Sequence, residues 1–128
     1  MTMSEQLPAT VESVALARRA VHSFAAGLDV DLDGMTLAVS EAVANVVAHA
    51  YDEDAVGVIE LSGSASPFEV AIVVRDRGHG LAAAGASHGA GFGIEIIRRL
   101  AQHVALEDST SGVALTMRFR RGGAWSAH

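Results

Sequence analysis

The order of helices and strands is the feature of this sequence that most narrows its fold. The spacing of apolar residues predicts two helices, over about Thr10–Ala26 and Leu32–Ala50, ahead of the first strand. The rest of the chain predicts a hairpin, a helix and a second hairpin: Ala55–Ser62 with Phe68–Arg75, then Gly91–Gln102, then His103–Glu107 with Val113–Arg120. A Rossmann fold needs a strand before each helix, whereas hairpins join antiparallel strands. The sequence therefore predicts an α/β (α+β) two-layer sandwich, in which helices cover one face of a mixed, mostly antiparallel sheet.

Length and composition predict a single domain over residues 1–128, with an ordered core at about 7–120 and a disordered lead at Met1–Leu7. Half of the residues are hydrophobic, which favours a packed core over disorder. The net charge of −6 argues against direct binding of nucleic acid, and the absence of cysteine excludes disulfides and thiolate metal sites. We identify no signal peptide and no apolar run long enough to span a bilayer, so we expect a cytoplasmic protein without membrane contact.

Glu41 and Asn45 lie one turn apart on the second predicted helix, on roughly the opposite side from its apolar stripe. Their neighbours on that side are mostly small or apolar, which is more typical of a pocket lining than of a solvated face. An amide oxygen together with phosphates can hold Mg²⁺, and a nearby carboxylate can polarise a hydroxyl for phosphoryl transfer. The alternative is an ordinary exposed Glu and a helix-surface Asn. Taken alone, the pair favours that alternative.

Asp76, Gly78 and Gly80 follow the apolar strand Val70–Val74. The strand would deliver Asp76 to the edge of the sheet, where a carboxylate can accept a hydrogen bond from the exocyclic amine of adenine. The glycines would allow close approach of the backbone to a ring. A turn that merely ends a strand is the common alternative.

Gly89, Gly91 and Gly93 precede or open the third predicted helix, with Phe92 between the last two. Glycines at a helix N-terminus free backbone N–H groups to bind a phosphate. The alternative is a flexible loop before a helix. No Walker motif is present, since no Gly-Lys-Ser/Thr follows, and no strand leads into the glycines as in a dinucleotide fingerprint.

The three motifs together resemble a known superfamily. Glu-x-x-x-Asn on a helix, Asp-x-Gly-x-Gly after a strand and Gly-x-Gly before a helix are similar, in this order, to the Bergerat-fold ATP-binding superfamily of gyrase, the large heat-shock chaperone, mismatch-repair ATPases and histidine kinases. Leu7-Pro8-Ala9, the run Ser40–Asn45 and His49-Ala50-Tyr51 resemble the small anti-sigma-factor serine/threonine kinases of bacterial partner switching. The resemblance covers about Leu7 to Arg120.

The resemblance implies ATP and Mg²⁺ as cofactors and a role for each motif. Asn45 would ligate Mg²⁺, and Glu41 would act as base or orienter in phosphoryl transfer. Asp76 would contact the adenine amine, with Gly78 and Gly80 shaping the base pocket. The phosphate side would be lined by Gly89, Gly91, Phe92 and Gly93, beneath a lid at about Leu81–Ala90. The implied partners are an anti-sigma-factor antagonist, phosphorylated on serine, and a sigma factor, sequestered by the free protein. A homodimer is compatible with the family.

Three departures from the family pattern bear on this function. No Arg or Lys lies between Gly80 and Gly93, where relatives commonly place a basic residue for the terminal phosphate. Val113 follows Gly112 where the superfamily usually has Thr. The short sequence before Leu7 predicts that the family's first strand is shortened or lost, which would affect a dimer that uses it. The alternative function is a non-catalytic module that sequesters a partner with weak or no nucleotide binding. A fragment of a histidine-kinase-like protein is disfavoured, because we identify no phosphoacceptor-helix region.

Overall fold

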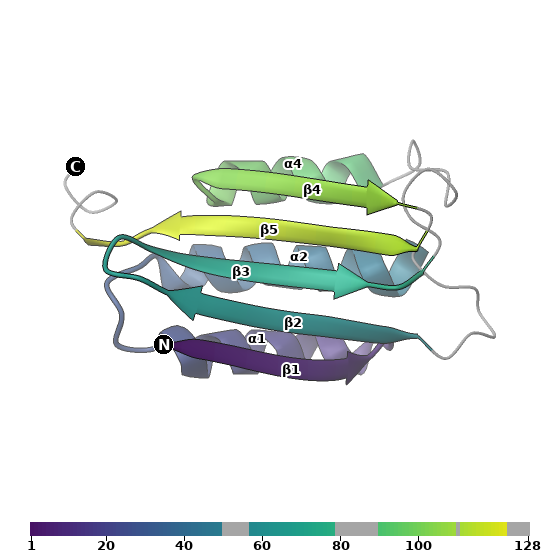
Figure 1. Cartoon of the computed structure of the whole chain (residues 1–128), viewed down its shortest axis with the longest axis horizontal. Coiled ribbons are helices and arrows are strands. Elements are labelled where there is room, and N and C mark those ends of the chain that lie inside the picture. The colour runs from purple at the N-terminus through teal and green to yellow at the C-terminus, as the bar shows by residue number, and fades with distance from the viewer. Residues whose placement is uncertain (50–56, 79–89, 110, 123–128) are drawn as a thin grey trace.

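The computed structural model describes residues 1–49, 57–78, 90–109 and 111–122. The described helices are α1 (Glu12–Ala25), α2 (Leu32–His49) and α4 (Ala90–Leu100). The strands are β1 (Thr2–Pro8), β2 (Val58–Ala65), β3 (Glu69–Asp76), β4 (His103–Ser109) and β5 (Gly112–Arg120). Figure 1 shows the sheet in front of the three helices. All of the helices expected from the sequence are present, with bounds close to those predicted.

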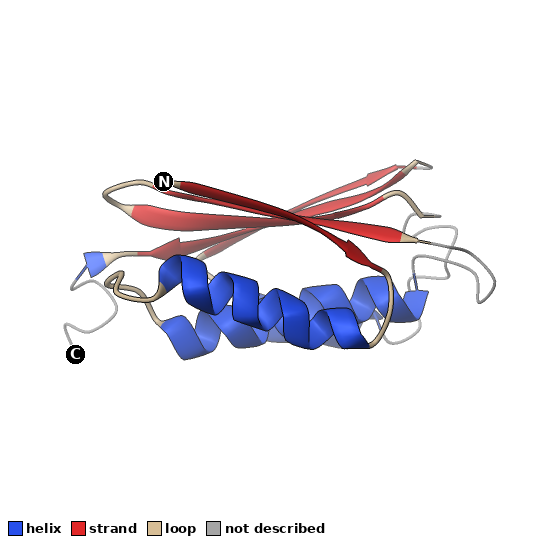
Figure 2. Cartoon of the chain, turned by 90° about the horizontal axis from the view of Figure 1, so that it is seen from below, coloured by secondary structure: helices blue, strands red, loops and turns tan. Residues whose placement is uncertain are grey.

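The sheet has five strands in the order β1-β2-β3-β5-β4, and all four neighbouring pairs are antiparallel. The mostly antiparallel sheet expected from the sequence is confirmed, and no parallel pair occurs among the described strands. The β2–β3 and β4–β5 pairs follow one another directly, whereas helices lie between β1 and β2 and between β3 and β5. Figure 2 shows all of the described helices on one face of the sheet, which confirms the two-layer sandwich. None of the described helices has the length and apolar character that a bilayer span requires.

Residues 2–8 form the first strand rather than a disordered lead. β1 pairs with β2 along its whole length, from Thr2 opposite Ser64 to Pro8 opposite Val58. Only Leu7 is buried and Met3 half-buried in this strand, so its sequence lacks the apolar alternation that predicts a strand. The ladder of backbone hydrogen bonds holds it at the edge of the sheet. The predictions of a disordered Met1–Leu7 and of a shortened or lost first strand are both wrong.

The hairpin between β2 and β3 is confirmed, but β2 ends three residues later than predicted. Gly63, Ser64 and Ala65 belong to the strand because β1 extends the ladder to that end of the sheet. The turn is accordingly short. The hydroxyl of Ser66 accepts hydrogen bonds from the backbone N–H groups of Phe68 and Glu69, both at 3.2 Å. This arrangement fixes the turn through a side chain, as serine commonly does.

The core lies between the helices and the inner face of the sheet. Alternate residues of β3 and β5, such as Ile72 and Met117, are fully buried there, as the alternation of apolar residues predicts. Helix α2 packs against α1 on one side, α4 on the other and β3 above. Met35, Val39 and Val43 anchor it with no exposed surface. This central position makes α2 the most enclosed helix described, and it fixes where Glu41 and Asn45 lie.

Candidate functional site

The motifs found in the sequence come together at one end of the domain. The C-terminal end of α2, the end of β3 and the start of α4 all lie at the right-hand end in Figure 1. Helix α2 contacts both α4 and β3, so these elements are neighbours and not merely aligned in one view. Three segments that are far apart in the sequence thus meet at one end of the helix layer, as a site shared by the three motifs requires.

Glu41 and Asn45 lie at the border of the buried face of α2, not opposite the core. Both side chains are half-buried, whereas Ala38 and Ala42 on the same flank are buried. The small and apolar neighbours expected around this pair do not share one environment, since Leu37 is 47% exposed. The reason is that α1 and α4 cover both flanks of α2, which widens its buried arc beyond the apolar stripe. The two polar side chains are therefore held beside the core while remaining accessible.

Asp76 is the one charged side chain that is buried among the described residues, with 5% of its surface exposed. Burial alternates along β3, so Asp76 shares the inner face with Val70, Ile72 and Val74 and faces the helix layer. Its Oδ1 accepts a hydrogen bond from the backbone N–H of Gly78 at 2.9 Å, and the backbone N–H of Val113 also donates to the carboxylate. The sequence predicts that this strand delivers Asp76 to the edge of the sheet. Asp76 is indeed the last residue of β3, but β3 is the central strand, so Asp76 lies at the end of the sheet and not on an edge strand.

Burial raises the pKa of Asp76, and the negative charge of Asp108 adds to the rise, although the two backbone N–H groups oppose it. An ionised carboxylate offers about four lone-pair positions, of which the N–H groups of Gly78 and Val113 use two. The described residues supply no other donor to this carboxylate, so acceptor positions remain there for a ligand. A buried carboxylate with unused acceptor positions can recognise an amine or amide N–H group of a ligand, because such a bond is strong where water is excluded.

The raised pKa of Asp76 predicts a pH-dependent gain in stability for Asp76→Asn. Asp76 contributes stability that is complete below the ordinary aspartate pKa and is lost as the pH rises through its folded pKa. Asparagine does not titrate. The free energy of unfolding of the variant, relative to the wild type, should therefore increase as the pH rises above about 4, the ordinary aspartate pKa. Urea unfolding at several pH values measures this difference, and a difference that shrinks as pH rises would contradict the burial cost of Asp76.

The glycine motifs are described only in part. Gly78 is placed beside Asp76 by its backbone hydrogen bond. Gly80, Gly89 and the expected lid at Leu81–Ala90 lie outside the described residues, apart from Ala90 at the start of α4. Gly91, Phe92 and Gly93 form the first turn of α4 with Ala90. The first N–H groups of a helix have no partner within it, so this turn can offer donors to an anion.

Gly112 is a residue of this site that the sequence did not single out. It begins β5 with φ at +138°, and a Cβ atom built there would lie 2.1 Å from the backbone oxygen of Asp76. Only glycine fits this close approach between the start of β5 and the end of β3. The resulting register places Val113 beside Asp76. The only local signal for Gly112 was a glycine between a turn and an alternating strand. Its contact partner, Asp76, is 36 residues away in the sequence, so the sequence did not show the contact.

A hollow of about 670 Å³ also lies at this end of the sheet, lined by Arg75, Asp76, Glu107, Asp108 and Val113 among others. Arg75 and Glu107 are exposed and alternate with the inward-facing residues of their strands, so they belong to the open face of the sheet. The side chain of Asp76 faces the helices instead. Asp76 thus lines one border of this hollow, and we place its ligand on the helix side of the sheet, towards which its side chain points.

The residues present fit a magnesium ion held mainly by a nucleotide. Among the described residues, no three His, Cys, Asp or Glu side chains are grouped as a metal cage. Mg²⁺ does not need such a cage, because it commonly binds one or two protein oxygens, phosphate oxygens and water. The half-buried amide of Asn45 lies on the helix that adjoins α4, the helix opened by the glycines. Asn45 can thus supply one oxygen ligand where phosphates would supply others.

A comparison with protein families decides the family of this chain. The family model of the histidine kinase-like ATPase domain matches residues 7–119. The chain belongs to this family of histidine kinase-like ATPase domains. The resemblance to the Bergerat-fold superfamily is thereby confirmed, and the match spans nearly the whole region over which the sequence motifs were recognised.

Curated relatives of this ATPase domain are similar over part of their length. The chain is 41% identical over 83 residues to the anti-sigma F factor of Pasteuria penetrans, covering 62% of this chain and 55% of that relative. It is 37% identical over 82 residues to the anti-sigma F factor of Anoxybacillus flavithermus, covering 62% of this chain and 56% of that relative. The chain thus spans about half the length of these relatives. Their names agree with the narrower resemblance to anti-sigma-factor kinases.

Solved structures share the fold of this histidine kinase-like ATPase domain. The structure of the RsbU and RsbW domains of a Mycobacterium tuberculosis protein has a TM-score of 0.75 at 22% identity, covering 95% of this chain and 33% of that one. The histidine kinase domain of a blue-light activated kinase from Erythrobacter litoralis has a TM-score of 0.63 at 18% identity, covering 94% and 64%. At these identities the likeness establishes the fold.

Proposed function

We propose that this domain binds ATP with Mg²⁺ at the end of the helix layer where the three motifs meet. The buried carboxylate of Asp76 is the observation that carries the proposal. It costs free energy to bury, faces the helices and keeps unused acceptor positions, which suits an adenine amine better than a purely structural role. Gly78 and Gly80 would shape the pocket for the base. Membership of an ATPase family supports the same assignment.

The phosphates would lie towards α2 and α4. Asn45 would ligate Mg²⁺, and Gly89, Gly91, Phe92 and Gly93 would line the phosphate side through the start of α4. Glu41, one turn before Asn45 on α2, would orient or deprotonate the hydroxyl that attacks the terminal phosphate. The half-burial of both α2 side chains beside the core supports these roles, since it restricts their motion without closing off a ligand.

The reaction that we propose is phosphorylation of a serine on an anti-sigma-factor antagonist by this domain, which would sequester a sigma factor when free of that antagonist. The names of the relatives, anti-sigma F factors, support an anti-sigma regulator. Partners of this kind act in transcription, so we expect the protein in the bacterial cytoplasm. An edge strand, β1, is present for a homodimer that uses it.

A second function has one specific observation in its favour. The sequence from Gly80 to Gly93 contains no Arg or Lys, so it offers no cation to the negative charge that develops on the transferred phosphate. A domain of this kind could bind nucleotide weakly, or not at all, and act only by sequestering a partner protein. Val113, which lies next to Asp76, also favours this second function, because its side chain offers no hydrogen bond to a base.

Calorimetric titration with ATP and ADP in the presence of Mg²⁺ distinguishes the two functions. We expect both nucleotides to bind the wild type. Asp76→Asn should weaken binding by about 10- to 100-fold, because it replaces a charged hydrogen-bond acceptor by a neutral one. GTP, which lacks the amine at that position, provides the matched control and should bind wild type and variant alike weakly. Absence of heat with either adenine nucleotide would contradict the kinase function and favour the sequestering module.

A further inference from the structure

The open face of the sheet carries a second hollow, at the end of the domain opposite to Asp76. It has a volume of about 460 Å³ and is lined by Phe68, Glu69, His103, Arg118, Arg120 and Arg121, among others. These residues come from the start of β3, the start of β4 and the end of β5, which lie at the left-hand end in Figure 1. We refer to it as the arginine hollow. It is separated from the proposed nucleotide site by the length of the sheet.

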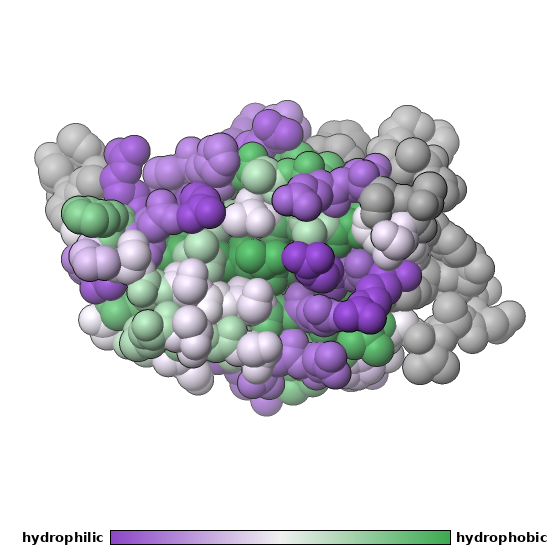
Figure 3. All heavy atoms as spheres, in the orientation of Figure 1, coloured by the Kyte–Doolittle hydropathy of each residue, from purple (hydrophilic) through white to green (hydrophobic). Residues whose placement is uncertain are grey.

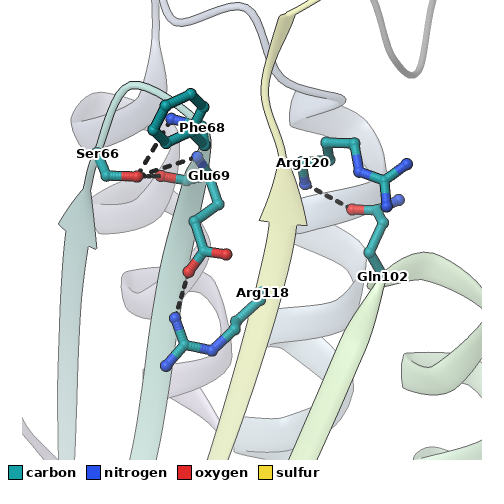
Figure 4. A network of polar contacts seen from close by, with 6 residues as sticks. All are labelled: Ser66, Phe68, Glu69, Gln102, Arg118 and Arg120. Atoms are coloured by element: carbon teal, nitrogen blue, oxygen red, sulfur yellow. Dashed lines mark hydrogen bonds and ion pairs between the residues drawn. The ribbon is translucent and has the colours of Figure 1, made fainter.

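Two of the three arginines are paired with carboxylates, and among the described residues the third is not. Arg118 pairs with Glu69 across β5 and β3, as Figure 4 shows. Arg121 donates to Asp29 at 2.7 Å and to the backbone oxygen of Ser66 at 2.8 Å, and it lowers the pKa of Asp29. Arg120 has no carboxylate partner within the part of the chain that the structure describes. Its backbone N–H, not its guanidinium, donates to Gln102 (Figure 4).

An exposed aromatic side chain lines the same hollow as Arg120. Phe68 is 79% exposed at the turn between β2 and β3, where Ser66 fixes the backbone. Its backbone oxygen accepts a hydrogen bond from the N–H of Arg121, so the turn is tied to the end of β5. Figure 3, which views this face, shows hydrophobic and hydrophilic side chains side by side on its surface. Aromatic side chains and arginine are both residue types that are enriched at protein interfaces.

We propose that the arginine hollow binds an extended acidic segment of a protein partner. A carboxylate of that segment pairs with Arg120, and an apolar side chain packs on Phe68. Charge complementarity argues for this occupant: Arg118, Arg120 and Arg121 are three of the nine basic residues in a chain with net charge −6, and they cluster around one hollow. Nucleic acid suits the hollow less well, because a phosphate backbone needs an extended basic face, whereas Arg118 and Arg121 are already paired with carboxylates.

The position of the hollow has a consequence for the partner. It lies on the face of the sheet that the helices leave open, whereas the proposed nucleotide site lies among the helices at the other end. A partner segment bound at Arg120 therefore does not compete with ATP for space. This surface would hold a protein partner in place irrespective of the nucleotide state, and it does not depend on the proposed kinase activity.

Fluorescence polarisation with a labelled peptide of alternating Glu and Leu residues tests the proposal on the full chain. We expect binding that Arg120→Glu weakens by at least about tenfold, because it places like charges together. Phe68→Ser should weaken binding independently of charge. Both side chains are exposed, so thermal unfolding of the variants should match the wild type.

Matched controls make each outcome decisive. Arg19→Glu applies the same charge reversal to an exposed arginine on α1, in the other layer, and should leave peptide binding nearly unchanged. A peptide with Gln in place of Glu should bind at least about tenfold more weakly. The proposal is overturned if the wild type shows no binding of the acidic peptide at peptide concentrations up to about 1 mM. A dissociation constant of about 1 mM still corresponds to a favourable free energy of binding. Equal losses in Arg120→Glu and Arg19→Glu, or tighter binding of a single-stranded oligonucleotide, would overturn it as well.

Discussion

Replacing Glu41 with alanine should lower the rate of phosphate transfer from ATP·Mg²⁺ to a cognate antagonist protein by about 100- to 10,000-fold, the usual contribution of a general base. The carboxylate lies one turn before Asn45 at the border of the buried face of α2. A hydroxyl that attacks the terminal phosphate needs such a group to orient it and accept its proton. ATP binding, by contrast, should change little, because the proposed contacts to the base and to Mg²⁺ come from Asp76 and Asn45.

Radiolabelled ATP and single-turnover conditions measure the transfer step apart from product release. Glu95→Ala is the matched control, since Glu95 is an exposed carboxylate on the neighbouring helix α4. It should transfer phosphate at the rate of the wild type. Equal rates for the wild type and Glu41→Ala would show that Glu41 has no catalytic role, and loss of ATP binding in Glu41→Ala would point to a structural one.

Replacing Gly112 with alanine should lower the free energy of unfolding by about 3 kcal/mol, through backbone strain and a steric clash together. At φ of +138° an L-residue is strained, and the added Cβ would meet the backbone oxygen of Asp76 at 2.1 Å and the Cα of Arg77 at 2.9 Å. Backbone atoms in a sheet cannot turn aside as a flexible side chain can. The end of β3 would be displaced, so the variant should also bind ATP more weakly.

Gly27→Ala is the control that separates the cost of backbone strain from the cost of the steric clash. Gly27 has φ of +87°, but nothing lies within 4 Å of an added Cβ. Its substitution should therefore cost only about 1 kcal/mol, from the conformation alone. Urea denaturation of both variants measures the difference. If the two substitutions cost the same, the contact between Gly112 and Asp76 would contribute nothing to stability.

The elements with strong periodicity were predictable from the sequence. Helix α2 has the predicted start and ends within a residue of the predicted end, because its apolar spacing is sustained over five turns. The inner face of β5 was also predictable, since Leu115, Met117 and Phe119 alternate along the strand and are all buried. Strand β1 was missed. It buries little and exists because β2 provides a partner, a long-range interaction that leaves no local pattern in residues 2–8.

The residues of the candidate site were likewise predictable only in part, because some of their properties follow from the sequence and others from packing. That Asp76 ends an apolar strand can be seen in the sequence, and the strand's alternation is enough to send its side chain to one face. That this face is dry, and that the pKa of Asp76 is consequently raised, depends on the helices packed against it. Glu41 and Asn45 were assigned to the same helix face correctly, but their position relative to the core depends on α1 and α4 covering both flanks of α2.

The sequence by itself determined the residue types, their order and the local periods: a helix with a carboxylate and an amide one turn apart, a strand ending in Asp76, and glycines before a helix. Only the tertiary structure decided that these groups share one end of the domain, that Gly112 must be glycine and that Arg120 is left without a carboxylate among the described residues. The physical reason is how far apart in the sequence the interacting residues are. Helix and strand periods arise from bonds between near neighbours in the chain, whereas burial, close backbone approach and charge pairing arise between residues that only packing brings together.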